Sequence, residues 1–346
     1  MKYPLSVVTA LENIYISPLE LCNLNCRHCY TNKTRHILDN TAILNFTKKY
    51  SGFLRSNSLS LKSILFCGGE VFILPGFTRL INNLLKKGIF ISIITNGTVD
   101  RLDKIKDPTN CQLLVSLDGP AEIHDKNRGK GNFQKSINFI NHAFDLGFPV
   151  EIMFLVTPDS YPYRYSMPNL LKDLTGHELN LNYITQKTIF YTDNHPLSNQ
   201  KNKKPALTSA QIIDIKKNFH SIPDKNFGCF QLSLQSNGNF YGCCESPHSL
   251  GTLSDSLQSI IDNFLESLSP CMSCAVSSFA GNQESFRGHS LKATLNAKHS
   301  PEPENSCQEN SGLCSGCIDP DFLCGYKKEL SLSTCQQVVK SFHDQK

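Results

Sequence analysis

The stretch that decides the fold is 14-IYISPLELCNLNCRHCY-30, in which an apolar segment runs directly into three cysteines. The apolar part, residues 14–17, has the character of a buried strand. Cys22, Cys26 and Cys29 follow it in a C-x3-C-x2-C pattern. Chemistry in parallel α/β sheets sits at the carboxyl ends of the strands, so this position favours a functional site over a set of unrelated core thiols.

Apolar segments alternate with helix-like segments over about residues 11–185. The expected strands are residues 14–17, 63–67, 89–95, 112–116, 150–156 and 180–184. The expected helices are residues 40–54, 77–87, 99–106, 133–146 and 164–174, and a further short helix is expected at 209–220. Alternation of this kind implies an α/β fold with a parallel sheet, either open or curled into a partial barrel.

Composition limits the possible classes of protein. The chain has 346 residues, of which 40% are hydrophobic and 18% charged, so it can bury a sizeable core. The net charge of +4 is near balance and does not indicate a nucleic-acid partner. We see no apolar run of membrane-spanning length and no signal peptide, so we expect a cytoplasmic protein with no membrane partner.

Cysteine is the unusual residue, with 15 copies, of which ten fall in residues 174–346. An odd number cannot pair completely within the chain, and a cytosolic chain keeps its thiols reduced. Thiolates that hold metal fit this composition better than disulfides. Cys67 and Cys111 lie in apolar strands, so we expect these two to be core thiols.

Three neighbouring thiolates restrict the kind of metal centre. A structural zinc site takes four protein ligands, and three leave one position open. A cubane iron–sulfur cluster held by three cysteines would leave one iron without a protein ligand, and that iron could take a chelating substrate.

The C-x3-C-x2-C motif after a first strand resembles that of the radical S-adenosylmethionine enzymes. The resemblance implies a [4Fe-4S] cluster on Cys22, Cys26 and Cys29 whose open iron binds the amino and carboxylate groups of S-adenosylmethionine. Reductive cleavage then yields a 5′-deoxyadenosyl radical. The family places an aromatic residue just before the third cysteine, near the adenine, and His28 stands at that position.

Two later passages match the family in order. Residues 64–71, ILFCGGEV, end in Gly68, Gly69 and Glu70, which resemble the family's "GGE" motif for the methionine amino group. Residues 115–120, VSLDGP, are followed by an IHD…R passage, so that Ser116 and Arg128 resemble the serine and arginine that contact S-adenosylmethionine. Read alone, the first passage is a glycine turn after a strand, and Arg128 is a surface charge.

The second passage is similar to that of anaerobic sulfatase-maturating enzymes and peptide maturases, which carry a cysteine-rich extension called SPASM. The extension holds auxiliary iron–sulfur clusters, and here Cys229 and the G-x4-C of Gly238 and Cys243 match it, whereas the later spacing departs from the pattern. The remaining candidate ligands are Cys271, Cys274, Cys307, Cys314, Cys317, Cys324 and Cys335. The alternative is a zinc ribbon on the two C-x2-C pairs.

Sulfatase-maturating enzymes place a catalytic aspartate directly after the cysteine of G-x4-C. Here that position holds Cys244, and Glu245 follows. A thiol is a poorer proton acceptor than a carboxylate, which argues against sulfatase maturation. Cys244 as a cluster ligand and Glu245 as a substitute carboxylate both stay open.

We therefore expect a partial (β/α)6 barrel over residues 10–190, a linker and helix over 191–220, and an iron–sulfur domain over 221–340 with an insertion at 275–306. The expected function is abstraction of hydrogen from a peptide or protein substrate, with electrons from a flavodoxin- or ferredoxin-like donor. Only 21 residues precede Cys22, so we expect no separate peptide-binding domain before the barrel. The alternatives are a radical enzyme acting on a small metabolite or cofactor precursor, and a non-enzymatic iron–sulfur or zinc protein.

Overall fold

The computed structural model describes residues 11–29, 31, 33–185, 207–219, 232–242 and 249–265. They fall into two compact units. The first, called here the parallel-sheet unit, comprises the described residues within Ile16–Leu44 and Ile64–His220. The second, the hairpin unit, comprises those within Met1–Tyr15, Asn45–Ser63 and Ser221–Lys346.

The parallel-sheet unit is built on strands in the order β6-β5-β4-β3-β2-β1. Their bounds are β1 (Asn13–Ile16), β2 (Ser63–Phe66), β3 (Phe90–Thr95), β4 (Cys111–Leu117), β5 (Val150–Val156) and β6 (Asn180–Thr185), of which β1 and β2 enter this unit at Ile16 and Ile64. The strands from β3 to β6 pair in parallel, with Ser116 opposite Met153. The expected α/β class with a parallel sheet is thus confirmed, and all six expected strands are present within one or two residues.

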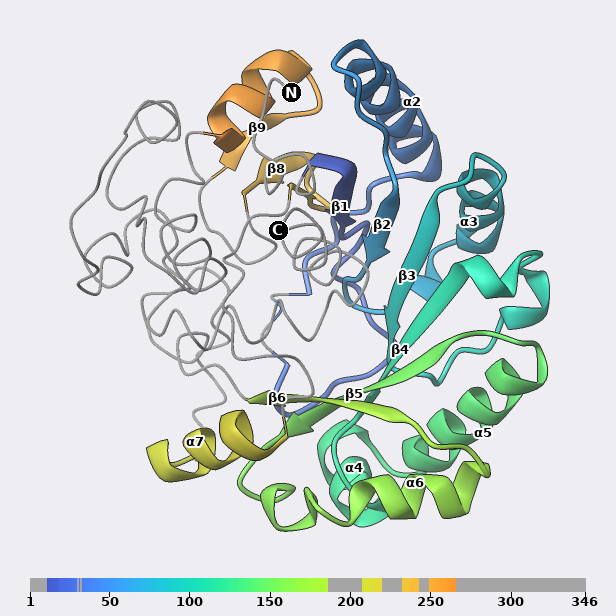
Figure 1. Cartoon of the computed structure of the whole chain (residues 1–346), viewed down its shortest axis with the longest axis vertical. Coiled ribbons are helices and arrows are strands. Elements are labelled where there is room, and N and C mark those ends of the chain that lie inside the picture. Colours follow the sequence, from blue (N-terminus) through green and yellow to red (C-terminus); the bar gives the residue numbers. More distant parts are fainter. Residues whose placement is uncertain are drawn as a thin grey trace, which may run out of the picture. The chain divides into compact units, whose positions relative to one another are not determined.

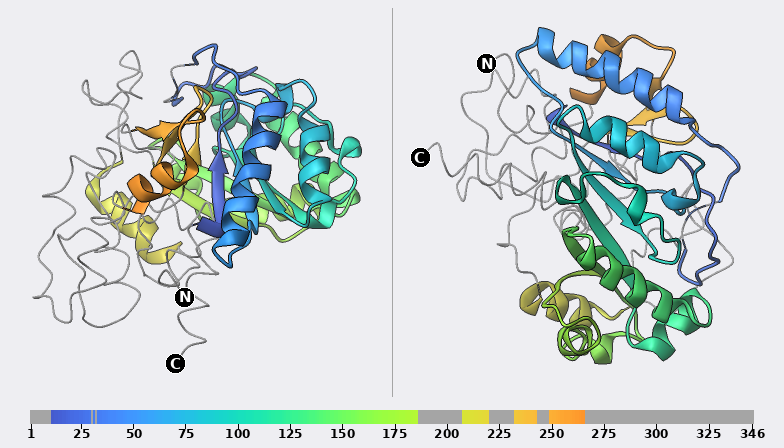
Figure 2. Two further views of the ribbon diagram at one scale, coloured as in Figure 1. Left: turned by 90° about the horizontal axis from the view of Figure 1, so that it is seen from above. Right: turned by 90° about the vertical axis from the view of Figure 1, so that its right-hand side faces the viewer.

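Helices connect the strands: α3 (Phe77–Leu85), α4 (Ala121–Arg128), α5 (Asn132–Asp145) and α6 (Met167–Thr175) lie in the parallel-sheet unit, and α2 (Asn40–Ser56) begins in it and continues into the hairpin unit. Figures 1 and 2 show α3, α5 and α6 along one face of the parallel sheet. The helix α3 packs on β3, and α5 packs on β4 and β5. Phe77 of α3 and Phe139 of α5 both pack edge-on against Phe72, which lies in a 3-10 turn at Val71–Ile73 after β2, with ring centres 5.6 Å and 5.9 Å away. This layer fixes the strands whose carboxyl ends carry the site.

Two expectations about helices were wrong. Residues 99–106 form no α-helix but a single 3-10 turn at Leu102–Lys104, followed by another at Pro108–Asn110. The segment has only Leu102 and Ile105 to bury, which is too little for a packed helical face. The helix α4 was not expected, because its sequence AEIHDKNR has almost no apolar periodicity. It buries His124 and Asn127 instead.

The helix α7 (Ser209–Asn218) is held by a capping box between Thr208 and Gln211 and by side chains that follow β5. Asp214 accepts hydrogen bonds from the Tyr161 hydroxyl at 2.7 Å and from Arg164 Nε at 2.8 Å. The Arg164 guanidinium also lies 3.8 Å from the ring centre of Tyr161. The helix α7 is therefore tied to the carboxyl end of β5.

The hairpin unit contains the short strands β7 (Ser233–Leu234), β8 (Asn239–Tyr241) and β9 (Ser249–Thr252), paired in antiparallel order. Gly238, the glycine of the expected G-x4-C motif, has a φ of 81° in the turn before β8. This left-handed conformation favours glycine, so the turn accounts for that glycine locally. A helix begins at residue 257 and continues to residue 265, the end of the described part.

Cys111 is fully buried at the start of β4, as expected of a core thiol, whereas Cys67 lies one residue beyond β2 and is half-buried. Within the described ranges, no helix combines the length and apolar character needed to cross a bilayer.

Candidate functional site

The three cysteines of the sequence motif lie in the loop that follows β1. Cys22, Cys26 and Cys29 are each half-buried, and the Cys29 N–H donates to the Cys26 carbonyl at 3.2 Å. The loop is stabilised further on by Lys33, whose ammonium donates to the Leu24 carbonyl at 2.9 Å. The motif thus occupies the carboxyl end of a strand, as the sequence indicated. We call residues 22–29 the cysteine loop.

Burial raises the pKa of two of the three thiols, Cys22 and Cys26. Burial raises the pKa of Cys26 to about 11; the Arg128 guanidinium opposes this shift, and Asp118, Cys29 and Cys22 add to it. Burial also raises the pKa of Cys22, with further increases from Glu70 and Cys29. Neighbouring thiolates repel each other, so a bound cation would favour their deprotonation and release protons. The donor set therefore suits a cationic metal centre.

In the part of the chain that the structure describes, no three Cys, His, Asp or Glu side chains gather as ligands of one metal ion would. Each cysteine of a cubane cluster binds a different iron, so cluster ligands stand farther apart than ligands of a single ion. Three half-buried thiols in one short loop fit the cluster better than a closed zinc site.

Gly68 and Gly69 lie where the chain between β1 and the cysteine loop passes close to the end of β2. Gly69 N–H donates to the Leu19 carbonyl at 2.9 Å, and Glu70 N–H donates to the Leu21 carbonyl at 3.0 Å. A Cβ atom at Gly69 would overlap the Leu21 carbonyl, and one at Gly68, whose φ is 145°, would overlap the Leu19 carbonyl. Both glycines are required for the approach of the chain's own backbone.

Glu70 is fully buried at the base of this contact. Its carboxylate accepts hydrogen bonds from Phe72 N–H at 3.1 Å, Thr95 Oγ1 at 2.9 Å and Asn96 N–H at 2.8 Å. Burial raises the pKa of Glu70, and these three donors oppose the increase. The carboxylate therefore joins the ends of β2 and β3 in addition to any contact with a cofactor.

Asn96 extends this connection to the cysteine loop. Its side-chain amide donates to Asn23 Oδ1 at 3.0 Å and lies 3.7 Å from the Cys22 sulfur. Asn96 belongs to the TNG turn, residues 95–97, that follows β3. Its contribution to the site became visible only when the fold brought β3 beside β1 through β2.

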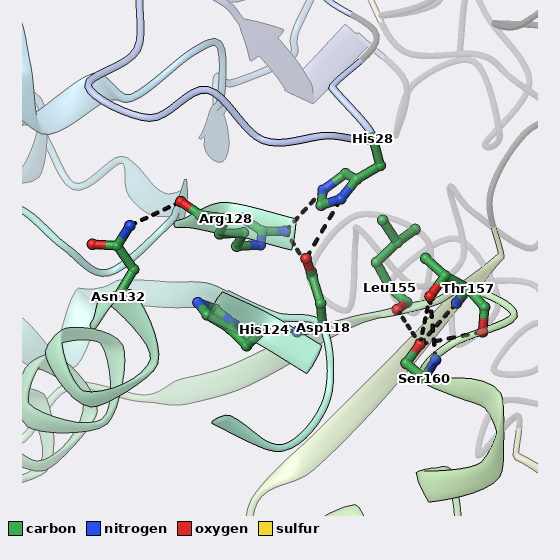
Figure 3. A network of polar contacts seen from close by, with 8 residues as sticks. All are labelled: His28, Asp118, His124, Arg128, Asn132, Leu155, Thr157 and Ser160. Carbon is green, nitrogen blue, oxygen red and sulfur yellow. Dashed lines mark hydrogen bonds and ion pairs between the residues drawn. The ribbon is translucent and has the colours of Figure 1, made fainter. Parts of the chain in front are cut away.

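The second group of site residues surrounds Asp118, the first residue after β4 (Figure 3). Asp118 is fully buried and lies 2.8 Å from Arg128 Nη2 and 3.5 Å from His28 Nδ1. Burial favours protonation of Asp118, but Arg128 and His28 outweigh it and hold the pKa at about 2. We call Asp118, Arg128 and His28 the Asp118 cluster. Sequence reasoning selected the histidine and the arginine and missed the aspartate, whose position in SLDGP was the available signal.

The predicted residues are brought together in part. Arg128 and His28 are neighbours, with 3.4 Å between Arg128 Nη2 and His28 Nε2. Ser116 is half-buried on β4, two residues before Asp118. The candidate auxiliary ligands lie outside the described residues: Cys229, Cys243, Cys271, Cys274, Cys307, Cys314, Cys317, Cys324 and Cys335. Cys244 and Glu245, the two proton-acceptor candidates, lie outside them as well.

A protein-family model matches the region of the chain that contains these residues. The Radical SAM superfamily model matches residues 16–161, which include the cysteine loop, Glu70 and the Asp118 cluster. Residues 16–161 thus correspond to a radical SAM domain.

Curated relatives of this radical SAM domain match part of the chain. The subtilosin biosynthesis protein AlbA of Bacillus subtilis is 29% identical over 192 residues, 52% of this chain and 42% of AlbA. A serine-type anaerobic sulfatase-maturating enzyme of Bacteroides thetaiotaomicron is 27% identical, over 56% of this chain and 51% of its own. Fe-coproporphyrin III synthase of Methanosarcina barkeri is 32% identical, over 39% of this chain and 34% of its own length. The chain thus spans about half, or less, of the length of these relatives.

A solved structure shares the fold. The structure described as native anSMEcpe with bound AdoMet and Cp18Cys peptide superposes with a TM-score of 0.61 at 16% identity, covering 96% of this chain and 99% of that one. At this identity the likeness shows the fold, and it agrees with the expected partial barrel.

One buried atom tests whether S-adenosylmethionine suits the site. Arg128 Nε is buried and has no hydrogen-bond acceptor among the described residues. A buried donor on a charged group costs free energy when it lacks a partner, so the position favours an anionic acceptor. A carboxylate supplies such an acceptor. The Asp118 cluster therefore fits the role that the sequence predicted for Arg128.

Proposed function

We propose that this protein is a radical S-adenosylmethionine enzyme that modifies a peptide or protein substrate. The observation that carries the proposal is the position of three half-buried thiols in the loop after β1, within the region that matches the radical SAM model. When bound, a [4Fe-4S] cluster with one open iron supplies the electron and the coordination site for cleavage of S-adenosylmethionine to a 5′-deoxyadenosyl radical.

The chain's own residues would bind and orient the two groups. Cys22, Cys26 and Cys29 would hold the cluster, and Arg128 would pair with the methionine carboxylate. His28, Gly68, Gly69 and Ser116 stay predicted contacts of S-adenosylmethionine, as does Glu70, whose carboxylate is already engaged with β3. The aromatic and aliphatic layer beneath the strands keeps the ends of β1 to β4 in fixed register, which holds these residues in place.

A peptide or protein is the favoured class of substrate, and two relatives support this choice. AlbA is described as a bacteriocin biosynthesis protein, and a second relative is described as a sulfatase-maturating enzyme. One or two auxiliary clusters on the carboxyl-terminal cysteines, and a flavodoxin- or ferredoxin-like electron donor, belong to the same proposal. The match to Fe-coproporphyrin III synthase supports a second candidate, a radical enzyme acting on a small cofactor precursor.

Production of 5′-deoxyadenosine tests the proposed reaction. Anaerobically reconstituted protein is incubated with S-adenosylmethionine and dithionite, and we expect 5′-deoxyadenosine to form. A variant with Cys22, Cys26 and Cys29 replaced by Ala should form none, whereas Cys111→Ala, a change at a buried thiol of β4, should retain the reaction. Protein with a full cluster load that forms no 5′-deoxyadenosine would contradict the proposal.

Iron and sulfide counts test the auxiliary clusters. About four irons per chain would mean one cluster, about eight would mean two, and about twelve would mean three, taking four irons per cubane. The triple Ala variant should lose about four irons and keep the rest. Zinc bound in place of iron, with no sulfide, would instead support the zinc ribbon.

Substrate class is tested by hydrogen transfer. With deuterated candidate substrates, deuterium should appear in 5′-deoxyadenosine from a peptide and not from a porphyrin precursor. Transfer from the porphyrin precursor alone would favour the second candidate.

A further inference from the structure

Asp118 lies at the meeting point of three segments of the parallel-sheet unit. It follows β4 directly, it pairs with Arg128 at the end of α4, and it contacts His28 in the cysteine loop (Figure 3). Its main-chain N–H donates to His124 Nδ1 at 3.4 Å, which adds a contact to the middle of α4. Each carboxylate oxygen of Asp118 therefore contacts a side chain from another segment, His28 or Arg128.

The end of α4 is attached to the cysteine loop by the backbone as well. Arg27 N–H donates to the Asn127 carbonyl at 2.9 Å, and Asn132 Nδ2 donates to the Arg128 carbonyl at 2.8 Å. Arg27 stands between Cys26 and Cys29, so this bond anchors the cysteine loop itself. The ion pair of Asp118 and Arg128 reinforces the same attachment from the side chains.

Charge and planarity explain why an aspartate serves here. The Arg128 side chain is only 10% exposed and the Asp118 side chain is fully buried, so each would be costly without the other. A guanidinium is planar, so fixing Nη2 also fixes the direction of Nε. Asp118 and His28 both contact Arg128 Nη2, and Nε is a buried donor that has no acceptor in the described part of the chain.

We propose that Asp118 is a positioning residue that holds Arg128 and His28 in the arrangement needed to bind S-adenosylmethionine and that fastens the cysteine loop to α4. The ligand-binding part of this inference rests on the proposed function. The anchoring part concerns the protein without its cofactors and stands on the contacts alone.

Affinity for S-adenosylmethionine tests the first part. Equilibrium dialysis of reconstituted protein should give a dissociation constant about tenfold or more higher for Asp118→Asn and for Arg128→Gln. The double variant should lose less affinity than the sum of the two single losses, because Asp118 acts in part through Arg128. Arg128→Lys keeps the charge without the planar fork and should fall between wild type and Arg128→Gln. Additive losses in the double variant would overturn the inference.

Asp159→Asn is the matched control, because Asp159 forms an exposed ion pair with Lys126 of the same helix, at 2.6 Å. It should leave the dissociation constant unchanged. A purely structural role for Asp118 would lower the melting temperature of Asp118→Asn while leaving its affinity at the wild-type value, and that result would overturn the proposal.

Hydrogen exchange of the protein without cluster tests the second part. The amide of Arg27 should exchange at least several-fold faster in Asp118→Asn than in wild type or Asp159→Asn. Equal rates would overturn the anchoring of the loop. A wild-type protein that carries its cluster but does not bind S-adenosylmethionine would overturn the proposed function, and the exchange result would still decide the anchoring.

Discussion

The carboxylate of Glu70 accepts a hydrogen bond from the main-chain N–H of Asn96 at 2.8 Å, deep inside the parallel-sheet unit. The bond joins the carboxyl end of β2 to that of β3. Asn96 in turn contacts Asn23 and the Cys22 sulfur, so one buried acid connects two strand ends with the cysteine loop. The stability of the loop should therefore depend on residues far from the cysteines in sequence.

Replacement of Thr95 by Val should destabilise the protein by about 1–3 kcal/mol. The Thr95 hydroxyl donates to the Glu70 carboxylate at 2.9 Å, and Val has nearly the same shape without the donor. Urea unfolding of the protein without cluster measures the change. Thr95→Ser keeps the hydroxyl and should lose clearly less stability. An equal loss of stability in both variants would show that the hydrogen bond is not the cause.

Gly69→Ala should disrupt the approach to the cysteine loop, because its Cβ would overlap the backbone carbonyl of Leu21. We expect a loss of about 1–3 kcal/mol in stability, as for an overpacked core, and a lower iron content after reconstitution. Gly52→Ala in α2 is the control, since a Cβ there meets nothing within 4 Å. Alanine is the better helix former, so this change should be neutral or stabilising. Full iron loading of Gly69→Ala would contradict the proposed fit.

Stability of the protein without cluster should fall as the pH is lowered from about 6.5 to about 4. Burial lowers the pKa of His124 to about 4, so within this window the unfolded chain binds a proton that the folded chain does not. Stability therefore rises with pH here and is lost on acidification, by up to about 3 kcal/mol at about 1.4 kcal/mol per pH unit.

His124→Asn removes this titration and should flatten the pH dependence, as measured by urea unfolding at pH 7.0, 5.5 and 4.5. His142, which is only partly exposed beside Asp100, offers the matched change, because replacing it by Asn leaves the buried His124 imidazole in place. The same slope in wild type and His124→Asn would rule out His124 as its source.

Asp214→Asn should loosen α7. Asp214 accepts from Tyr161 and Arg164 but is partly exposed, so we expect only a modest loss of stability. Hydrogen exchange of residues 209–218 should become faster than in wild type. Glu178→Gln breaks the exposed pair with Lys172 and should leave this exchange unaltered; unchanged exchange in Asp214→Asn would show that α7 is held by other contacts.

The sequence alone determined where the strands lie along the chain and where the cysteine loop follows them. Both are local properties: apolar runs of strand length are readable in one dimension, and the cysteines adjoin the first run. Parallel strands joined by helices then leave few topologies, because the crossovers have one hand. His28 and Arg128 were predicted as site residues through a resemblance to the motifs of a known family.

Only the tertiary structure decided how these residues are held. Asp118 and His28 are 90 positions apart in sequence, as the residue numbers show, and a carboxylate after a strand looks the same whether it faces solvent or an arginine. The helix α4 has no apolar periodicity, so its contact with the cysteine loop left no pattern to read. Pairing of buried charges depends on distances through space, which follow from the packing of β4, α4 and the cysteine loop together.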